Sequence, residues 1–323
     1  MSGQIQLRLL ADQFYLGDTR EALTYAKRLA VLPGTSPLAA TRDILTGRAI
    51  AASGSPVPQE LVGQYPILGA LGNPNVVPGP ESTQPLKTAE RLLAATLAAS
   101  RQSSPEAAWE LLAPFAENPG TSSEDGGLAT AEAAALAVVL LLRLGQVESA
   151  RATLAEVKVQ AHADDLSLSD SEETIIRQLA EIWVTLVARA PPSVESQRSA
   201  FFTLRELTER FQATPKLLCA QATVHLVQGN LRDAEHLLLE SQKLDPTNEV
   251  TLANLFVVAS HLGRPQATLD EYLKTLSEVA PKNPLLGGLM TFPATGPGVP
   301  TITESQVTTF DQLFDQAAAR ISG

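Results

Sequence analysis

A spacing of 34 residues recurs between positions 184 and 281, and it constrains the fold more than any other feature of this sequence. Three consecutive frames, which begin at Val184, Leu218 and Leu252, place small and large side chains at matching positions without a gap. This period and this pattern are typical of tetratricopeptide-like helical hairpins, each of which must stack on its neighbours to bury its apolar faces. The repeat therefore predicts helical hairpins that follow one another along the chain.

The matched positions combine small residues with large ones. Small side chains let two helices cross at an interaxial distance near the short end of the usual range of about 8 to 10 Å, and large side chains fill the space between turns. The three frames consist of Val184, Val187, Ala188, Ala200, Leu204 and Leu207; of Leu218, Gln221, Ala222, Ala234, Leu238 and Ser241; and of Leu252, Leu255, Phe256, Thr268, Tyr272 and Thr275.

Glycines mark the turns inside the predicted hairpins. Gly229 and Gly263 are also 34 residues apart, and they fall where the two helices of a hairpin must be joined. Glycine is the usual residue just past a helix end because it tolerates a positive φ angle. Gly145 and Gly17 occupy the same place in two similar stretches upstream, so the repeat extends over most of the chain.

Composition favours the same fold. Hydrophobic residues make up 44% of the chain and aromatic residues only 5%, and the excess is alanine and leucine, the strongest helix formers. The sequence therefore predicts an all-α protein: a tetratricopeptide-like solenoid of helical hairpins, coiled as a right-handed superhelix, over residues 1–291.

Several segments depart from the repeat. Residues 53–86 contain seven prolines and are predicted to form an irregular Pro/Gly-rich surface insertion, within which 61–71 could pack as a short element. Residues 292–302 are predicted to be a linker, and 303–323 a C-terminal amphipathic helix that packs on the solenoid, as a cap, or on its partner. The apolar stripe of this terminal helix includes Val307, Phe310, Leu313, Phe314 and Ile321.

Charge and cysteine content narrow the classes of function. The net charge of −11 and the pI near 4.9 oppose binding to phosphate backbones and to anionic lipid, so we expect no nucleic acid and only an indirect membrane association. The single cysteine, Cys219, excludes an internal disulfide framework. The first dozen residues lack the apolar block of a signal peptide, so the sequence predicts a cytoplasmic protein.

No set of residues has the spacing of a catalytic or metal site. The four histidines lack the i, i+4 pairing of a helical zinc site, and no phosphate-binding glycine motif occurs. Cys219 has no histidine placed near it by the sequence, so we interpret it as a structural thiol. The sequence thus predicts a binding protein without enzymatic activity, cofactor or metal. Apart from the length of the chain, no feature of the sequence favours the alternative of an all-helical enzyme.

A solenoid of this kind offers a concave face, lined by the first helix of each hairpin, as its binding surface. The residues expected there are Thr185, Arg189, Lys216, Cys219, Thr223, Val250, Ala253 and Val257. This mixed and increasingly apolar set suits a large, lasting interface with one protein partner. The alternative is a tetratricopeptide co-chaperone or adaptor that binds a peptide tail, and a clamp for an acidic tail requires a cluster of Lys, Arg and Asn on the same helices.

Several stretches together resemble the coatomer epsilon subunit family. They are "FYLGDTREAL" from Phe14, "AEIWVTLVA" from Ala180, "LLCAQATVHLVQGNLRDAEHLLLES" from Leu217, "NLFVVASHLGRP" from Asn254 and "FDQLF" from Phe310. The resemblance implies a non-catalytic subunit of the COPI vesicle coat that binds the C-terminal domain of the alpha coatomer subunit. It also implies a cytoplasmic protein, peripheral on Golgi membranes and coated vesicles, that supports Golgi-to-ER and intra-Golgi transport. The insertions at 53–86 and before the last helix depart from the family pattern.

Replacing Phe310 and Phe314 together by alanine tests the terminal helix. If its stripe covers the open end of the array, the free energy of unfolding should fall by several kcal/mol, because each buried phenylalanine contributes roughly 3 to 5 kcal/mol. Circular dichroism melting measures the loss. An unchanged melting temperature together with weaker partner binding would place the stripe in the interface instead.

Overall fold

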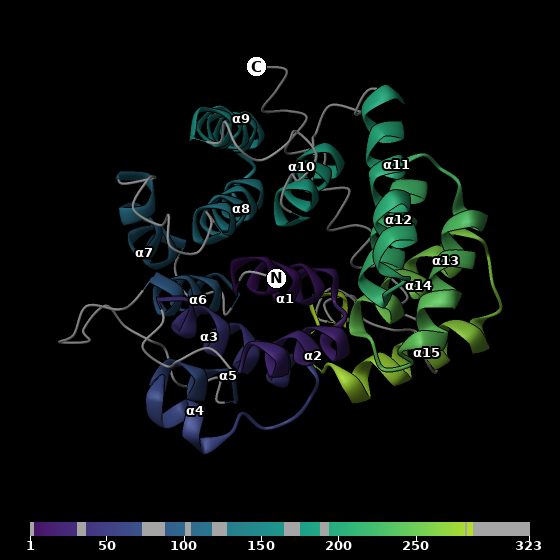
Figure 1. Cartoon of the computed structure of the whole chain (residues 1–323). Helices are drawn as coiled ribbons and strands as arrows, with labels where there is room; N and C mark the ends of the chain where they lie inside the picture. Colours follow the sequence, from purple (N-terminus) through teal and green to yellow (C-terminus); the bar gives the residue numbers. More distant parts are fainter. Residues whose placement is uncertain are drawn as a thin grey trace, which may run out of the picture. The chain divides into compact units, whose positions relative to one another are not determined.

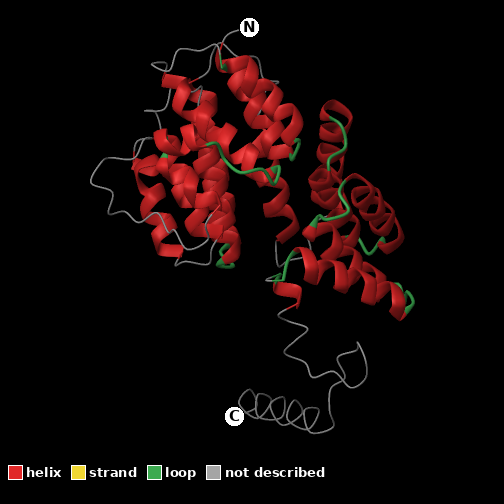
Figure 2. Cartoon of the chain, turned by 90° about the horizontal axis from the view of Figure 1, so that it is seen from below, coloured by secondary structure: helices red, strands yellow, loops and turns green. Residues whose placement is uncertain are grey.

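The computed structural model describes residues 3–30, 37–72, 88–100, 105–117, 128–164, 175–187, 194–281 and 283–286. Within these ranges every regular element is a helix and none is a strand (Figures 1 and 2). The prediction of an all-α helical-repeat protein is therefore confirmed. The chain divides into two compact units, Met1–Leu217 and Leu218–Gly323. Arg189, the linker at 292–302 and the whole terminal stripe from Val307 to Ile321 lie outside the described residues.

The first unit is built mainly from pairs of packed helices. Its pairs α1 and α2, α6 and α7, and α8 and α9 are hairpins, while α3 packs on α1, α2 and α6, and α10 packs on α8, α9 and α11 (Figure 1). The elements are α1 (Gly3–Leu16), α2 (Thr19–Leu29), α3 (Pro37–Ala52), α4 (Gln59–Gln64), the 3-10 turn η1 (Pro66–Leu68), α5 (Gly69–Gly72), α6 (Thr88–Ser100), α7 (Pro105–Glu117), α8 (Leu128–Arg143), α9 (Val147–Asp164), α10 (Ile175–Val187) and α11 (Val194–Phe211).

The second unit continues the hairpin pattern. The division between the units falls inside α12 (Pro215–Val227), which is followed by α13 (Leu231–Leu244), α14 (Glu249–His261) and α15 (Gln266–Val279). Helix α14 packs on both α13 and α15. Ala222, Ala234, Leu238 and Leu255 from three successive helices are fully buried in one cluster, as the small and large positions of the 34-residue frame predict.

The hairpin turns share one backbone geometry. Gly17, Gly145, Gly229 and Gly263 all have positive φ angles, which confirms the predicted turns. At Gly17 the amide donates to the carbonyl of Phe14 at 3.1 Å, and the next amide, of Asp18, donates to Gln13 at 2.9 Å. These two bonds satisfy carbonyls that the end of α1 would otherwise leave unpaired, and the φ of +90° favours glycine.

Burial follows the predicted pattern at most positions of the first two frames and less closely in the third. Ala200, Leu204 and Leu207 of α11 are buried, as are Val184 and Leu252. Val187, the last residue of α10, is 49% exposed. Ala188 lies outside the described residues.

Part of the Pro/Gly-rich segment is helical and packs on the first unit. Helices α4 and α5 and the turn η1 span residues 59–72, and Tyr65, Ile67, Leu68 and Ala70 are buried in the cluster that also contains Ile44 of α3. Leu68 packs so closely on Gly47 that an added Cβ there would lie 2.7 Å from a Leu68 methyl carbon. A larger residue at position 47 would therefore force the buried Leu68 side chain to shift.

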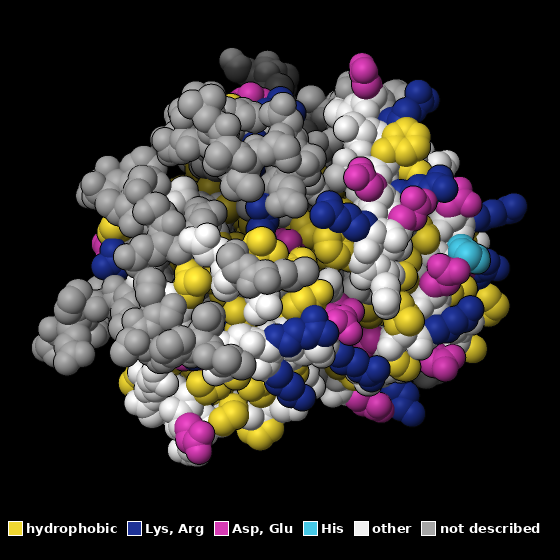
Figure 3. All heavy atoms as spheres, viewed as in Figure 1, with side chains coloured by type: hydrophobic (Ala, Val, Ile, Leu, Met, Phe, Trp, Pro, Cys, Tyr) yellow, Lys and Arg dark blue, Asp and Glu magenta, His cyan; other side chains and the backbone are white. Residues whose placement is uncertain are grey.

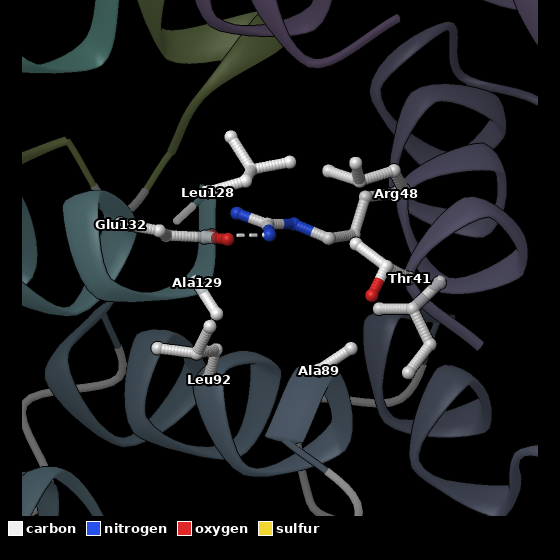
Figure 4. A pocket seen from close by; sticks show the side chains of 9 residues that line it. Thr41, Arg48, Ala89, Leu92, Leu128, Ala129 and Glu132 are labelled. Atoms are coloured by element: carbon white, nitrogen blue, oxygen red, sulfur yellow. Dashed lines mark hydrogen bonds and ion pairs between the residues drawn. The ribbon is translucent and has the colours of Figure 1, made fainter. Parts of the chain in front are cut away.

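A buried ion pair joins α3 to α8 in the first unit. Nη1 of Arg48 donates to Oε1 of Glu132 at 2.5 Å, and both side chains are about nine-tenths buried (Figure 4). Burial alone would lower the pKa of Arg48, but the adjacent Glu132 carboxylate raises it above its ordinary value. The guanidinium also lies 4.9 Å from the centre of the Phe14 ring.

The hollow beside this pair is too small for a ligand. It is lined by Thr41, Arg48 and Glu132 together with apolar side chains of α3, α6 and α8, and its volume is about 10 Å³ (Figure 4). That volume corresponds to roughly one water molecule. The ion pair is therefore a structural feature of the first unit.

Replacing Glu132 with alanine should destabilise the first unit. Removal of one member of a buried pair leaves an uncompensated charge, so the free energy of unfolding should fall by about 3 to 5 kcal/mol. Urea titration followed by tryptophan fluorescence measures this, since Trp109 and Trp183 both belong to the first unit. The matched control is Glu148→Ala in an exposed pair with Arg151, which should change stability by less than about 1 kcal/mol. Equal losses in the two variants would contradict the structural role of the Arg48 pair.

Candidate partner interface

Helix α14 presents a stripe of small and medium apolar side chains. Val250 is 51% exposed, and Ala253 and Val257 are half-buried. The spacings of three and seven residues place the three on one side of the helix. Asn248 starts the helix by accepting the backbone amide of Thr251 at 3.0 Å, which determines where this stripe begins.

Cys219 lies in the core of the second unit and not on its surface. Only 5% of the residue is exposed, and its Sγ lies 3.1 Å from Oγ1 of Thr251 and 3.6 Å from Oγ of Ser241. The two hydroxyls are themselves 2.7 Å apart, and Asn248 Oδ1 accepts from Thr251 Oγ1 at 3.1 Å. These contacts connect α12, α13 and α14 through polar atoms, so Cys219 is a buried thiol and we remove it from the expected binding surface.

Thr223, also on α12, is half-buried, and its hydroxyl donates to the carbonyl of Cys219 at 2.8 Å. A partner at this position would therefore contact the methyl group and backbone of Thr223 rather than a free hydroxyl. Val227 is one turn further along the same side of α12 and is 40% exposed. The spacing of four residues from Thr223 identifies Val227 on the same side of the helix, although Val227 is not among the residues expected from the frame positions.

Lys216 belongs to the first unit, and its ammonium group is engaged within it. The residue as a whole is exposed, but Nζ donates to the backbone carbonyl of Tyr15 at 2.7 Å. Nearby, the hydroxyl of Thr214 donates to the carbonyl of Leu16 at 2.6 Å. Both bonds satisfy carbonyls in the last turn of α1, where positive charge is favourable. Withdrawal of the ammonium from solvent, with a further contribution from Arg48, lowers the pKa of Lys216 to about 8.

Thr185 faces a hollow between α10 and α11. The residue is half-buried, and its hydroxyl donates to the carbonyl of Glu181 in its own helix at 2.9 Å. The hollow has a volume of about 420 Å³ and is lined largely by polar side chains, among them Glu195, Ser199 and Thr203. The surface at Thr185 in the first unit is thus polar, whereas the exposed stripe of α14 in the second unit is apolar.

Charge is dispersed over α13 and α15 on the face drawn in Figure 3. On the face drawn in Figure 3, basic and acidic side chains are interspersed over α13 and α15 and do not separate into patches. Among the described residues of the expected binding set, Lys216 is the sole cation, and its ammonium is bonded to Tyr15. In the same described ranges no three His, Cys, Asp or Glu side chains are grouped to hold a metal ion. None of the described helices combines the length and apolar character needed to span a bilayer.

A bidentate ion pair connects the turn before α15 to α13. Nε of Arg264 donates to Oε1 of Glu235 at 2.8 Å, and Nη2 donates to Oε2 at 2.5 Å. Glu235 and Arg264 come from the sequence blocks "HLVQGNLRDAE" and "VASHLGRP", which lie within two of the stretches that resemble the coatomer epsilon family. The pair gives a structural role to one charged residue of each block, and the sequence alone did not indicate that these two charges meet.

Residues 121–291, just over half of the chain, match the family model described as the coatomer epsilon subunit. The region includes α8 to α15 and therefore both the α14 stripe and the Glu235 and Arg264 pair. The two blocks that contain Glu235 and Arg264 also lie inside the matched region.

Curated relatives agree with the family match. The chain is 35% identical over 115 residues to coatomer subunit epsilon-2 of Oryza sativa subsp. indica, and the aligned region covers 36% of each chain. It is 34% identical over 89 residues to coatomer subunit epsilon of Dictyostelium discoideum, and this aligned region covers 28% of this chain and 30% of the relative. It is 30% identical over 103 residues to coatomer subunit epsilon-1 of Arabidopsis thaliana, covering 32% and 34%. The aligned regions thus span about a third of the length of these curated relatives.

The lowered pKa of Lys216 predicts a pH dependence of stability. Its folded-state pKa is about 8 and its ordinary value is 10.5, so between these values the unfolded chain binds more protons than the folded one. The contribution of Lys216 to stability is therefore complete above about pH 10.5 and is lost as the pH falls through about 8.

Wild type and Lys216→Arg are compared by urea titration at a series of pH values. Arginine keeps the positive charge but stays protonated throughout this range, so the difference in unfolding free energy should move in favour of the wild type as the pH rises. Comparison at each pH cancels the titration of other groups such as Tyr15. Parallel pH profiles for the two proteins would mean that the ammonium is not withdrawn from solvent.

Proposed function

Because the chain belongs to the coatomer epsilon subunit family, we propose that it is a non-catalytic structural subunit of the COPI vesicle coat. Its partner is the alpha coatomer subunit, whose C-terminal domain it binds to form a heterodimer within the coat complex. The protein works in the cytoplasm, reaches Golgi membranes and COPI-coated vesicles through the coat, and supports Golgi-to-ER and intra-Golgi transport.

The observation that carries this proposal is the partly exposed apolar stripe of α14. Val250, Ala253 and Val257 offer methyl groups on a helix that is held firmly between α13 and α15. A rigid apolar helix face contributes to a lasting protein interface because little conformational entropy is lost when it is covered. Depletion of charge at the centre of such a face is also typical of protein interfaces.

The chemistry of the same set argues against a clamp for an acidic peptide tail. Such a clamp needs several unengaged cations that form charge-assisted hydrogen bonds with carboxylates. Cys219 is buried, Thr223 donates to its own helix, and the ammonium of Lys216 is bonded to a backbone carbonyl. The co-chaperone or adaptor function therefore has less support than the coat subunit.

Binding of the C-terminal third of the alpha coatomer subunit to the full chain tests the proposal. The expected result is an equimolar complex that survives high salt, because an apolar interface is little affected by ionic screening. Val250→Asp should weaken binding about tenfold or more if the stripe lies at the centre of the interface. Aspartate at the second position of α14 is compatible with the helix, since acidic residues are favoured in a first turn.

The matched control is Leu239→Asp on α13, an exposed apolar residue outside the predicted surface, which should bind normally. Equal weakening by both substitutions would contradict the assignment of the interface to α14. Binding to a heat-shock chaperone tail without binding to the alpha fragment would replace the proposal with the co-chaperone function.

A further inference from the structure

Helix α15 is partly uncovered at positions whose equivalents on α13, one repeat earlier, are fully buried. Positions 34 residues apart make the comparison direct. Ala234, Leu238 and Ser241 of α13 have no exposed surface. Their equivalents on α15, Thr268, Tyr272 and Thr275, are all half-buried.

This difference in burial between α13 and α15 depends on the helix that follows each of them in the chain. Helix α14 packs on α13 and covers it, and α14 also packs on one side of α15. Leu276 marks the covered side of α15 and is fully buried. The half-buried residues lie on an adjoining side together with Val279, which is 40% exposed. We call Thr268, Tyr272, Thr275 and Val279 the α15 stripe.

The chain begins another repeat here and then departs from it. Leu286 stands 34 residues after Leu252, is buried, and clusters with Leu252 and Leu276. Asn283 accepts the amide of Leu285 at 3.0 Å, as an asparagine at a helix start does. The sequence then runs through Gly287, Gly288 and Pro293, which disfavour a helix of normal length. The described chain therefore covers only one end of the surface that a complete repeat would cover.

The remaining sequence contains one segment with the properties of the missing cover. Residues 303–323 carry an apolar stripe that includes Phe310, Leu313 and Phe314 at helical spacing. A helix over residues 303–321 would be about 28 Å long, and the 14 residues of α15 span about 21 Å. The 16 residues from 287 to 302 can extend to roughly 50 Å, so the tether reaches any part of α15.

We propose that residues 303–323 form a helix that lies along α15 of the same chain, with Phe310 and Phe314 on the α15 stripe. The tether gives the segment an effective concentration in the millimolar range, far above that of a second copy in a dilute solution. The chain thus closes its own helical array with a helix that is separate from the repeat. This inference is independent of the coat function, because it concerns a different helix face from the α14 stripe.

Contact quenching of a bimane label by tryptophan tests this contact. Glu271→Cys places the label on an exposed position of α15 beside the stripe, and Phe314→Trp places the quencher in the terminal helix. The native Cys219 is buried and should stay unlabelled in the folded protein. The full chain should show severalfold lower bimane fluorescence than the same labelled chain without Phe314→Trp.

Two controls use the opposite side of each helix. Lys274→Cys moves the label to an exposed position away from the stripe, and Gln312→Trp moves the quencher to the polar side of the terminal helix. Lys274→Cys paired with Phe314→Trp, and Glu271→Cys paired with Gln312→Trp, should both show no quenching. Quenching should not depend on protein concentration and should disappear in denaturant.

Three outcomes would overturn the proposal. Equal fluorescence with and without Phe314→Trp would mean that the segment does not lie on α15. Quenching that grows with protein concentration would make a second copy the occupant, and quenching that appears only after the alpha fragment is added would mean that the partner brings the two together.

Discussion

Close helix crossings at alanine are the constraint on which the packing of both units depends. Ala22 in α2, Ala150 in α9 and Ala222 and Ala234 in α12 and α13 have no exposed surface. A larger side chain at such a crossing would separate the two backbones and expose the leucines around it. Because a hairpin cannot bury both faces alone, each crossing positions the next helix, and an exposed helix face is one that no following hairpin covers.

Polar contacts at a few buried points add specificity to this mostly apolar packing. Glu132 pairs with Arg48 across α3 and α8, and Thr214 and Lys216 donate to the last turn of α1. In the second unit, Cys219 and Thr251 connect α12 to α14. Each contact joins residues that are distant in sequence. Apolar burial alone tolerates small shifts between helices, whereas these hydrogen bonds require one arrangement.

The same division between covered and uncovered faces organises function. Residues engaged in internal bonds, such as Cys219 and Lys216, have little to offer a partner, while Val250 keeps its side chain accessible on a rigid helix. The α14 stripe and the α15 stripe then have different occupants in our proposals, a separate protein for the first and the chain's own terminal segment for the second. Repeat proteins commonly need such a distinct terminal element, because the last repeat has no neighbour.

The sequence by itself determined the helical class and the hairpin turns at Gly229 and Gly263, because helical periodicity and glycine turns are properties of local sequence. Its particular residue blocks, rather than the period, carry the resemblance to the epsilon family. The tertiary structure alone decided that Cys219 is buried, that Lys216 bonds to Tyr15, and that Leu68 packs on Gly47. Each of these depends on an atom supplied by another part of the chain, up to 201 positions away, and a spacing pattern carries no information about which distant segments meet.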